Sequence, residues 1–215
     1  MQKTKIEWTD YTWNPIKGIC PVGCWYCYAR RMYQRFKWNP EIRIEEIRSC
    51  PQRPSRIFVC STFELFHPTI SKEWRDTIFR FIENSPQHTF QILTKFPENI
   101  NRPMPDNVWL GVTIESSNEL PKVAGLNRAK AKIKFINFEP LISHIDPRWG
   151  LLRSINWIVI GRLTGYGHKY DPTKEQLKTM FSRIRATIWH PPIFLKTNLK
   201  EIWREPLIQE FPDVA

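Results

Sequence analysis

Short apolar runs alternate with longer amphipathic stretches along most of the chain. The runs are rich in β-branched and aromatic residues, which is typical of buried strands in a parallel sheet. They lie at 56–60, 90–93, 108–112, 133–136, 157–160 and 193–195. This pattern predicts strands that are separated by helices.

Helical patterns occupy several of the intervening stretches. Ser71 is suited to cap a helix whose apolar stripe starts at Trp74. Asp171 and Pro172 make a good N-cap and first-turn pair for a second helix, whose stripe starts at Leu177. Weaker patterns predict helices over 120–131 and directly after the last of three clustered cysteines.

The alternation of strands and helices indicates an α/β fold class made of right-handed βαβ units. The strand count favours an open or partial (β/α)6-like barrel of about six or seven mostly parallel strands, and a flat doubly wound sheet is the alternative. A chain of 215 residues provides one sizeable core but is short for two. We therefore expect a single domain over 1–215.

Polar residues follow each predicted strand, where α/β folds bind their ligands. Thr, Ser and Asn also cap helices and form turns, so some of these residues are expected to be structural. Charged side chains are costly to bury there without a partner, so we expect some of them to contact a ligand. The residues are Ser61, Thr62, Glu64, Thr94, Lys95, Thr113, Glu115, Asn137, Glu139, Arg162, Thr164, Lys196 and Asn198.

The chain is basic, with 32 Lys and Arg against 21 Asp and Glu and a net charge of +11. This excess indicates either a phosphate-rich partner or simply a basic surface. No apolar run approaches the roughly 20 residues that cross a bilayer, and the first residues lack the apolar stretch of a signal peptide. We therefore expect a cytoplasmic protein that does not bind membranes.

Three of the five cysteines fall within eight positions, as Cys20, Cys24 and Cys27 in the spacing C-x3-C-x2-C. An odd number clustered in this way does not suit a disulfide framework. One loop with this spacing can place thiolates on three irons of a [4Fe–4S] cluster and leave the fourth iron open for a small molecule. Gly18 and Gly23 give this loop the backbone freedom it needs.

Other interpretations of the cysteines are weaker. A structural zinc site needs a fourth ligand, and the candidates stand at no conventional spacing; they are His67, His88, Cys50 and Cys60. A redox pair of Cys24 and Cys27 would leave Cys20 unexplained. Cys60 lies in a predicted strand and is expected in the core, while Cys50 has no assigned role.

The cysteine motif, with an aromatic residue before the third cysteine and a β/α chain after it, resembles the radical S-adenosylmethionine (SAM) superfamily. Further blocks resemble the phage Gp37/Gp68-type family of radical SAM-like proteins and extend over nearly the whole chain. They are TKIEWTD at 4–10, TWNP at 12–15, CYA at 27–29, LFH at 65–67, HTFQILTK at 88–95, NVWLGV at 107–112, FEPL at 138–141 and FLK at 194–196.

The chain departs from this family at two places. Many members have a longer gap between the first two cysteines, whereas the gap here is the superfamily's three residues. Many members also carry Gly-Gly-Glu-Ser-Gly after a late strand, where this chain has Gly-Arg-Leu-Thr-Gly at 161–165. The role of that glutamate cannot be carried over to Leu163.

The resemblance implies a radical SAM enzyme. Cys20, Cys24 and Cys27 would hold a [4Fe–4S] cluster in the loop 18–29, which would cleave SAM reductively to a 5′-deoxyadenosyl radical with electrons from a donor such as ferredoxin or flavodoxin. It assigns no catalytic residue for the substrate. The remaining residues would contact SAM or the substrate: Tyr26 near the adenine; Ser61, Thr62 and Glu64 near the SAM amino group; Thr113, Glu115 and Glu139 near the ribose or substrate; and Lys95 or Arg162 near a carboxylate or phosphate.

The resemblance does not name the substrate, which could be a nucleic acid, a protein or peptide, or a small molecule. A basic barrel with exposed aromatic residues could bind DNA or RNA for repair or modification, as spore photoproduct lyase does elsewhere in the superfamily. The candidate aromatic residues are Trp25, Trp38, Trp74, Trp149 and Trp203, although Trp74 is expected in the core. A non-catalytic nucleic-acid-binding protein with an iron–sulfur cluster or zinc is the alternative function.

Overall fold

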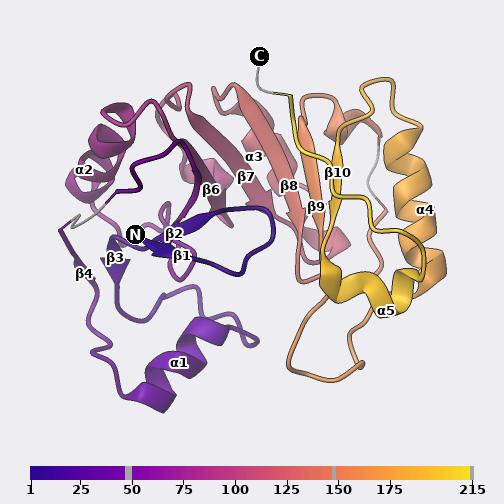
Figure 1. The fold of residues 1–215 in the computed structure, drawn as a ribbon, viewed down its shortest axis with the longest axis horizontal. Helices are drawn as coiled ribbons and strands as arrows, with labels where there is room; N and C mark the ends of the chain where they lie inside the picture. The colour runs from indigo at the N-terminus through magenta and orange to yellow at the C-terminus, as the bar shows by residue number, and fades with distance from the viewer. Residues whose placement is uncertain (47–49, 147–148, 214–215) are drawn as a thin grey trace.

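The computed structural model describes residues 1–46, 50–146 and 149–213, apart from the side chains of Trp149 and Leu151. Its main element is an eight-stranded sheet in the order β1-β2-β5-β6-β7-β8-β9-β10 (Figure 1). The strands are β1 (Gln2–Lys3), β2 (Tyr11–Trp13), β5 (Arg56–Val59), β6 (Thr89–Thr94), β7 (Val108–Thr113), β8 (Ile133–Phe138), β9 (Trp157–Ile160) and β10 (Ile193–Leu195). Two further strands, β3 (Ile16–Lys17) and β4 (Arg43–Ile44), pair with each other.

All six strands predicted from the apolar runs are present, and they are parallel to one another. β2 extends this parallel sheet beside β5, and β1 adds an antiparallel strand at the edge. Neighbouring strands follow the chain order, unlike the reversed order of a doubly wound sheet. The α/β class with a mostly parallel sheet is therefore confirmed. Among the described strands β1 and β10 do not pair, so the sheet is open.

The helices are α1 (Tyr28–Phe36), α2 (Lys72–Glu83), α3 (Lys122–Arg128), α4 (Lys174–Arg185) and α5 (Lys200–Trp203). Ser71 caps α2 as predicted, accepting a hydrogen bond from the Trp74 N–H at 3.3 Å. The predicted cap at Asp171 is wrong, because Thr173 caps α4 in a capping box with Gln176. The Asp171 carboxylate instead binds Arg162 at 2.8 Å.

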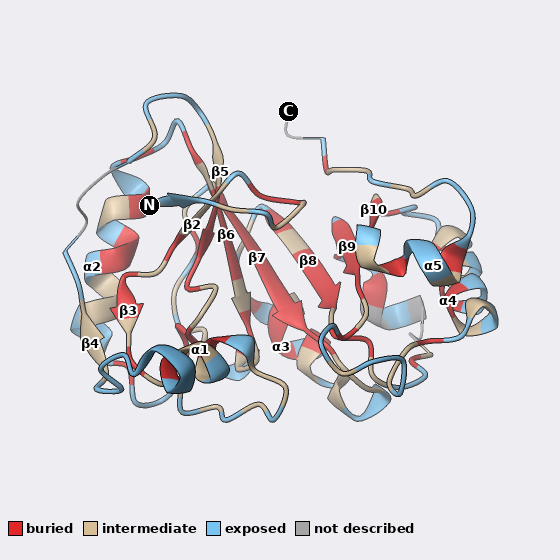
Figure 2. Ribbon diagram, turned by 60° about the horizontal axis from the view of Figure 1, so that its bottom comes forward, coloured by how far each residue is buried: buried red, intermediate tan, exposed pale blue. Residues whose placement is uncertain are grey.

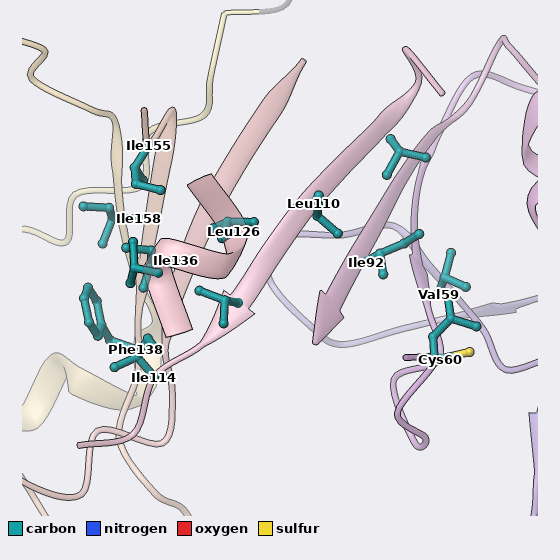
Figure 3. Packing of buried hydrophobic residues seen from close by; sticks show 14 of the residues in the cluster. Val59, Cys60, Ile92, Leu110, Ile114, Leu126, Ile136, Phe138, Ile155 and Ile158 are labelled. Atoms are coloured by element: carbon teal, nitrogen blue, oxygen red, sulfur yellow. The ribbon is translucent and has the colours of Figure 1, made fainter. Parts of the chain in front are cut away.

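One face of the sheet packs against helices through aliphatic side chains. Figure 3 shows Val59, Ile92 and Leu110 from neighbouring strands in the same cluster as Leu126 of α3. Cys60 belongs to this cluster and is buried, as predicted. Successive residues of a strand point to opposite faces of the sheet. The residues that alternate with these aliphatic ones therefore point to the second face.

The second face has an aromatic core. Trp157 lies at its centre, fully buried, with its ring 5.3 Å from that of Phe135 and 6.1 Å from that of Trp8. Phe211, near the C-terminus, stacks on Trp157 at 5.4 Å. Segments from both ends of the chain thus cover this face.

The strands β5 to β10 are mostly buried, whereas α1 is largely exposed on the side toward which the arrowheads of β7 and β8 point (Figure 2). The carboxyl ends of the strands therefore lie on the side of the cysteine loop and α1. Within the described ranges no helix has the length and apolar character required to cross a membrane.

Candidate functional site

The carboxyl ends of the central strands form a polar rim above the aromatic core. In the parallel sheet Thr113 is paired with Asn137 at the last position of the β7–β8 register. Both residues are buried, and each lies an even number of positions after an aromatic core residue of its own strand, Trp109 or Phe135. They therefore belong to the face that carries the aromatic core, at its polar end.

Lys95 connects the ends of β6 and β7 to the cysteine loop. Its ammonium group forms an ion pair with Glu115 and lies 3.0 Å from the hydroxyl of Tyr26. The Tyr26 hydroxyl also donates a hydrogen bond to Glu115. Tyr26 precedes the third cysteine directly, so this group of three side chains attaches the cysteine loop to the sheet. The structure thus brings together three of the predicted site residues.

Burial governs the protonation of these groups. Desolvation lowers the pKa of Lys95, and the neighbouring Cys24 and Glu119 oppose this shift. Burial also raises the pKa of Tyr26, with Cys24 again the next contribution, so Tyr26 stays a neutral donor. Cys24 is therefore close enough to both side chains to interact with them electrostatically.

Glu64 is almost fully buried and is bound by the protein itself. Its carboxylate accepts hydrogen bonds from the Thr94 hydroxyl at 2.7 Å, the Lys95 N–H at 2.8 Å and the Phe66 N–H at 3.0 Å. Burial raises its pKa more than these donors lower it. These contacts fix the loop after β5 against the end of β6, and Glu64 also lies near Cys20, whose pKa it affects.

A second charged pair lies across the rim. Lys196, after β10, forms an ion pair with Glu139, which follows β8. Gly161 separates them, and a Cβ there would stand 2.9 Å from the Glu139 carboxyl carbon and 3.0 Å from a Lys196 side-chain carbon. A glycine at this position therefore allows the pair to close over the end of β9.

Asn137 holds an unused acceptor between these two groups. Its side chain is 5% exposed, and among the described residues no donor reaches its Oδ1. A buried amide oxygen without a partner is costly, and a polar ligand or water normally satisfies it. Asn137 was noted in the sequence among the strand-end residues but received no ligand role there.

Ser61 and Thr62 form a third part of the rim beneath α1. The side chain of Asn14, directly after β2, bonds the Ser61 hydroxyl at 3.1 Å and accepts from the Thr62 N–H at 3.2 Å. The Tyr28 hydroxyl donates to the Ser61 carbonyl at 3.1 Å. Thr62 also lines the hollow that the cysteine loop encloses.

The cysteine loop encloses a small hollow that all three motif cysteines line, together with Gly18, Gly23, Arg30 and Thr62. Gly18 has φ of +107°, and a Cβ there would lie 2.5 Å from the Glu41 carbonyl oxygen. Gly23 has φ of +71°. Position 18 therefore requires glycine, and the backbone at position 23 favours it. Arg30 donates to the Cys20 carbonyl at 3.1 Å and so ties the loop to α1.

The motif thiols are free and partly exposed. The Cys27 sulfur caps α1, accepting from the Arg30 N–H at 3.4 Å, and burial raises the pKa of the Cys20 thiol. Within the described ranges no three His, Cys, Asp or Glu side chains converge on a point that could hold a single metal ion. Three thiols around one hollow nevertheless provide the donor set of a three-cysteine cluster, whose irons occupy separate corners. The residues present therefore fit such a cluster by their chemistry.

Arg162 follows β9 and is bound by protein partners. Its guanidinium binds Asp171 at 2.8 Å and donates to the Asn198 carbonyl at 2.5 Å. These bonds join the loop after β9 to the segment after β10. The role of Arg162 toward a ligand stays a prediction.

The tryptophans that the sequence offered as candidates for exposed aromatic residues divide into three groups. Trp25 and Trp38 are about half exposed, as the sequence analysis expected. Trp203 is buried, which overturns that expectation, because Phe181 of α4 packs against it at 5.7 Å. Trp74 packs against the aliphatic core as expected, and the side chain of Trp149 is outside those described.

A contact that the sequence did not predict joins the cysteine loop to the segment between β9 and α4. The Trp25 ring lies 5.1 Å from that of Tyr166 and 5.0 Å from that of Tyr170. The Tyr166 hydroxyl donates to the Trp25 carbonyl at 3.3 Å. These residues are about 140 positions apart in the sequence, and no local pattern links them.

Comparison with known proteins gives one match. No curated protein and no solved structure is significantly similar to the chain. The sequence model of one family matches residues 3–179, which include the cysteine loop and the ends of β5 to β9. The chain therefore belongs to the family DUF5131, described as a protein of unknown function.

Proposed function

We propose that this protein is a radical SAM enzyme that binds a [4Fe–4S] cluster through Cys20, Cys24 and Cys27. The observation that carries the proposal is the position of the cysteine loop. Three free thiols line one hollow, and the loop is attached through Tyr26 to charged residues at the carboxyl ends of two parallel strands. The resemblance to the Gp37/Gp68-type radical SAM-like proteins supports the same function.

The sequential strand order supports a partial (β/α) barrel of the radical SAM type, with the polar rim as its opening. When bound, the cluster would supply the electron that cleaves SAM to methionine and a 5′-deoxyadenosyl radical. A donor such as ferredoxin or flavodoxin would deliver that electron. A reducing compartment such as the cytoplasm would keep the thiols free to bind iron.

The residues of the rim would bind and orient SAM. Lys95 and Glu115 fix the Tyr26 ring beside the cluster loop, where it would face the adenine. Because each rim ion pair is satisfied within the protein, it presents a preorganised dipole to the ligand instead of a free charge. The unpaired Oδ1 of Asn137 would accept a hydrogen bond from the ribose or the amino group.

Other rim residues would hold the loops that surround the ligand. Glu64 draws the loop after β5 toward β6, which places Ser61 and Thr62 beneath α1 near the expected amino group of SAM. Thr113 and Glu139 stand on the opposite side, near the expected ribose or substrate. The aromatic core below would exclude water from that side of the site.

The proposal is tested by reductive cleavage of SAM. Anaerobically reconstituted protein, incubated with dithionite and SAM, should release 5′-deoxyadenosine, and C24A should release none. C50S is the matched control, because Cys50 is a free, exposed cysteine outside the loop and should leave the yield unchanged. A protein that holds its cluster but releases no 5′-deoxyadenosine would instead support a non-catalytic iron–sulfur protein.

A further inference from the structure

The aromatic group beside the cysteine loop is open to solvent. Trp25 is 53% exposed, although its ring contacts Tyr166, Tyr170 and Tyr26. An isolated exposed tryptophan is unremarkable, but a ring held by three others has a fixed orientation. Such a ring offers a rigid flat surface to a planar ligand group.

Cations accompany this aromatic group without matching acidic residues. The Arg31 guanidinium lies 5.0 Å from the centre of the Tyr166 ring, and the Lys169 ammonium lies 5.1 Å from that of Tyr170. Residues 28–38 include four cations and no Asp or Glu. Within the described residues no carboxylate is in ion-pair contact with Arg31, Arg35 or Lys169.

A second aromatic pair lies at the other end of α1. Phe36 and Trp38 stack at 5.4 Å with planes 23° apart, and both are about half exposed. The Arg35 guanidinium lies 5.4 Å from the Phe36 ring. Arg31 and Arg35 are four residues apart on the helix and therefore lie on one face of it. The face thus offers rings at both ends of α1 and two guanidinium groups between them.

We propose that this face binds single-stranded nucleic acid, with bases stacked on Trp25 and on the Phe36–Trp38 pair and with phosphates bound by Arg31 and Arg35. This inference deepens the proposed function, because it rests on the same site and names its substrate class. Trp25 adjoins Tyr26, so a base stacked there would lie next to the opening of the rim.

The chemistry of the face favours a single strand over a duplex. Bases of a duplex stack on one another, so exposed protein rings cannot stack on their faces without first unstacking them. A single strand offers both free base faces and phosphates. A protein partner with both acidic and basic residues would be expected to meet both cations and carboxylates on this face. Because the cations here have no neighbouring carboxylates, a polyanion is the favoured ligand.

Binding can be measured by fluorescence anisotropy with the reconstituted protein under anaerobic conditions. The probes are a labelled 15-nucleotide DNA strand, the RNA strand of the same sequence and the corresponding DNA duplex. We expect saturable binding to a single strand, tighter than to the duplex by about tenfold or more, and weakening steeply as salt rises. A preference between DNA and RNA would identify the sugar of the substrate.

Two variants separate stacking from phosphate contacts. W25A should weaken single-strand binding about tenfold and leave the salt dependence unchanged, whereas W25F should keep most of the affinity. R31A/R35A should reduce the logarithmic slope of affinity against salt by about 1 to 2. Circular dichroism checks that each variant is folded.

The double variant W25A/R31A removes one ring and one cation and should lose at least as much affinity as W25A. Its matched control is W189A/R153A. Trp189 is 46% exposed, and the Arg153 guanidinium lies 5.6 Å from its ring, so this pair also combines an exposed tryptophan with an arginine, outside the cysteine loop. The affinity of W189A/R153A for the single strand should stay within about twofold of that of the wild type. The inference is overturned if no single strand binds at low salt, if the duplex binds more tightly, or if this control loses as much affinity as W25A/R31A.

The inference and the proposed function can fail separately. Release of 5′-deoxyadenosine without single-strand binding would refute the nucleic-acid face and leave the enzyme class standing. Single-strand binding that the W25A/R31A variant loses, without SAM cleavage, would support the face and refute the radical reaction.

Discussion

The aromatic core and the polar rim lie on the same face of the same strands. They differ in how completely contacts within the protein occupy their side chains. At the core, Trp157 is enclosed by five other rings. At the rim, charged side chains form pairs that stay partly accessible, and Asn137 keeps an acceptor without a donor. A few residues along β8 separate these two environments.

This difference indicates a division of roles along the strands. Burial of large rings contributes strongly to stability, but the rings offer no charged or reactive group to a ligand. Paired charges with a buried, unsatisfied acceptor add little to stability and are more useful for binding a ligand. Substitutions at the core should therefore affect folding, while conservative substitutions at the rim should affect ligand binding first.

The largest effect is expected at the core. W157A should lower the free energy of unfolding by about 3–5 kcal/mol, because it removes the ring on which the others pack. Denaturation by urea measures this loss. A loss below about 1 kcal/mol would show that the core collapses around the gap and that the two regions are less distinct than described.

A smaller effect is expected for the ion pair at the rim. K95M leaves the largely buried Glu115 carboxylate without its ammonium partner and should cost about 1–3 kcal/mol. The double variant K95M/E115Q should recover part of that loss, since it removes the unpaired charge. K72M is the control, because it breaks an exposed pair and should cost less than about 0.5 kcal/mol. Equal losses for K95M and the double variant would contradict coupling between the two charges.

The smallest expected effect is a pH dependence from Glu64. Its folded pKa is raised, so its contribution to stability is fully present below the ordinary carboxyl pKa and is lost as pH rises through the folded value. The unfolding free energy of the wild type, relative to E64Q, should therefore decrease from about pH 4 upward. A relative stability that grows with pH would mean that the hydrogen bonds to Glu64 outweigh its burial.

The sequence predicted the central strands because each is long enough to show a continuous apolar run. β2 was missed because Thr12 interrupts its short segment, Tyr11–Trp13, so that no continuous apolar run marks it. It acquires its place in the sheet by pairing with β5. The cap of α4 was misplaced by two residues for a tertiary reason. Arg162 recruits the Asp171 carboxylate, which leaves Thr173 to cap the helix.

The sequence identified the cysteine loop and most of the rim by spacing and by position after strands. It could not predict which rim residues pair, because the partners of Lys95 and Lys196 depend on how the strand ends meet. It also treated Trp25 and Trp203 alike. Packing by α4 buries Trp203, while two tyrosines from a distant loop hold Trp25 at the surface.

The most direct test of the central claim is the metal content of protein purified without oxygen. The cysteine loop should bind about four irons per chain with the absorption of a [4Fe–4S] cluster, and C20A, C24A and C27A should each lose it while C50S retains it. One equivalent of zinc without iron, lost in the same three variants, would contradict the claim.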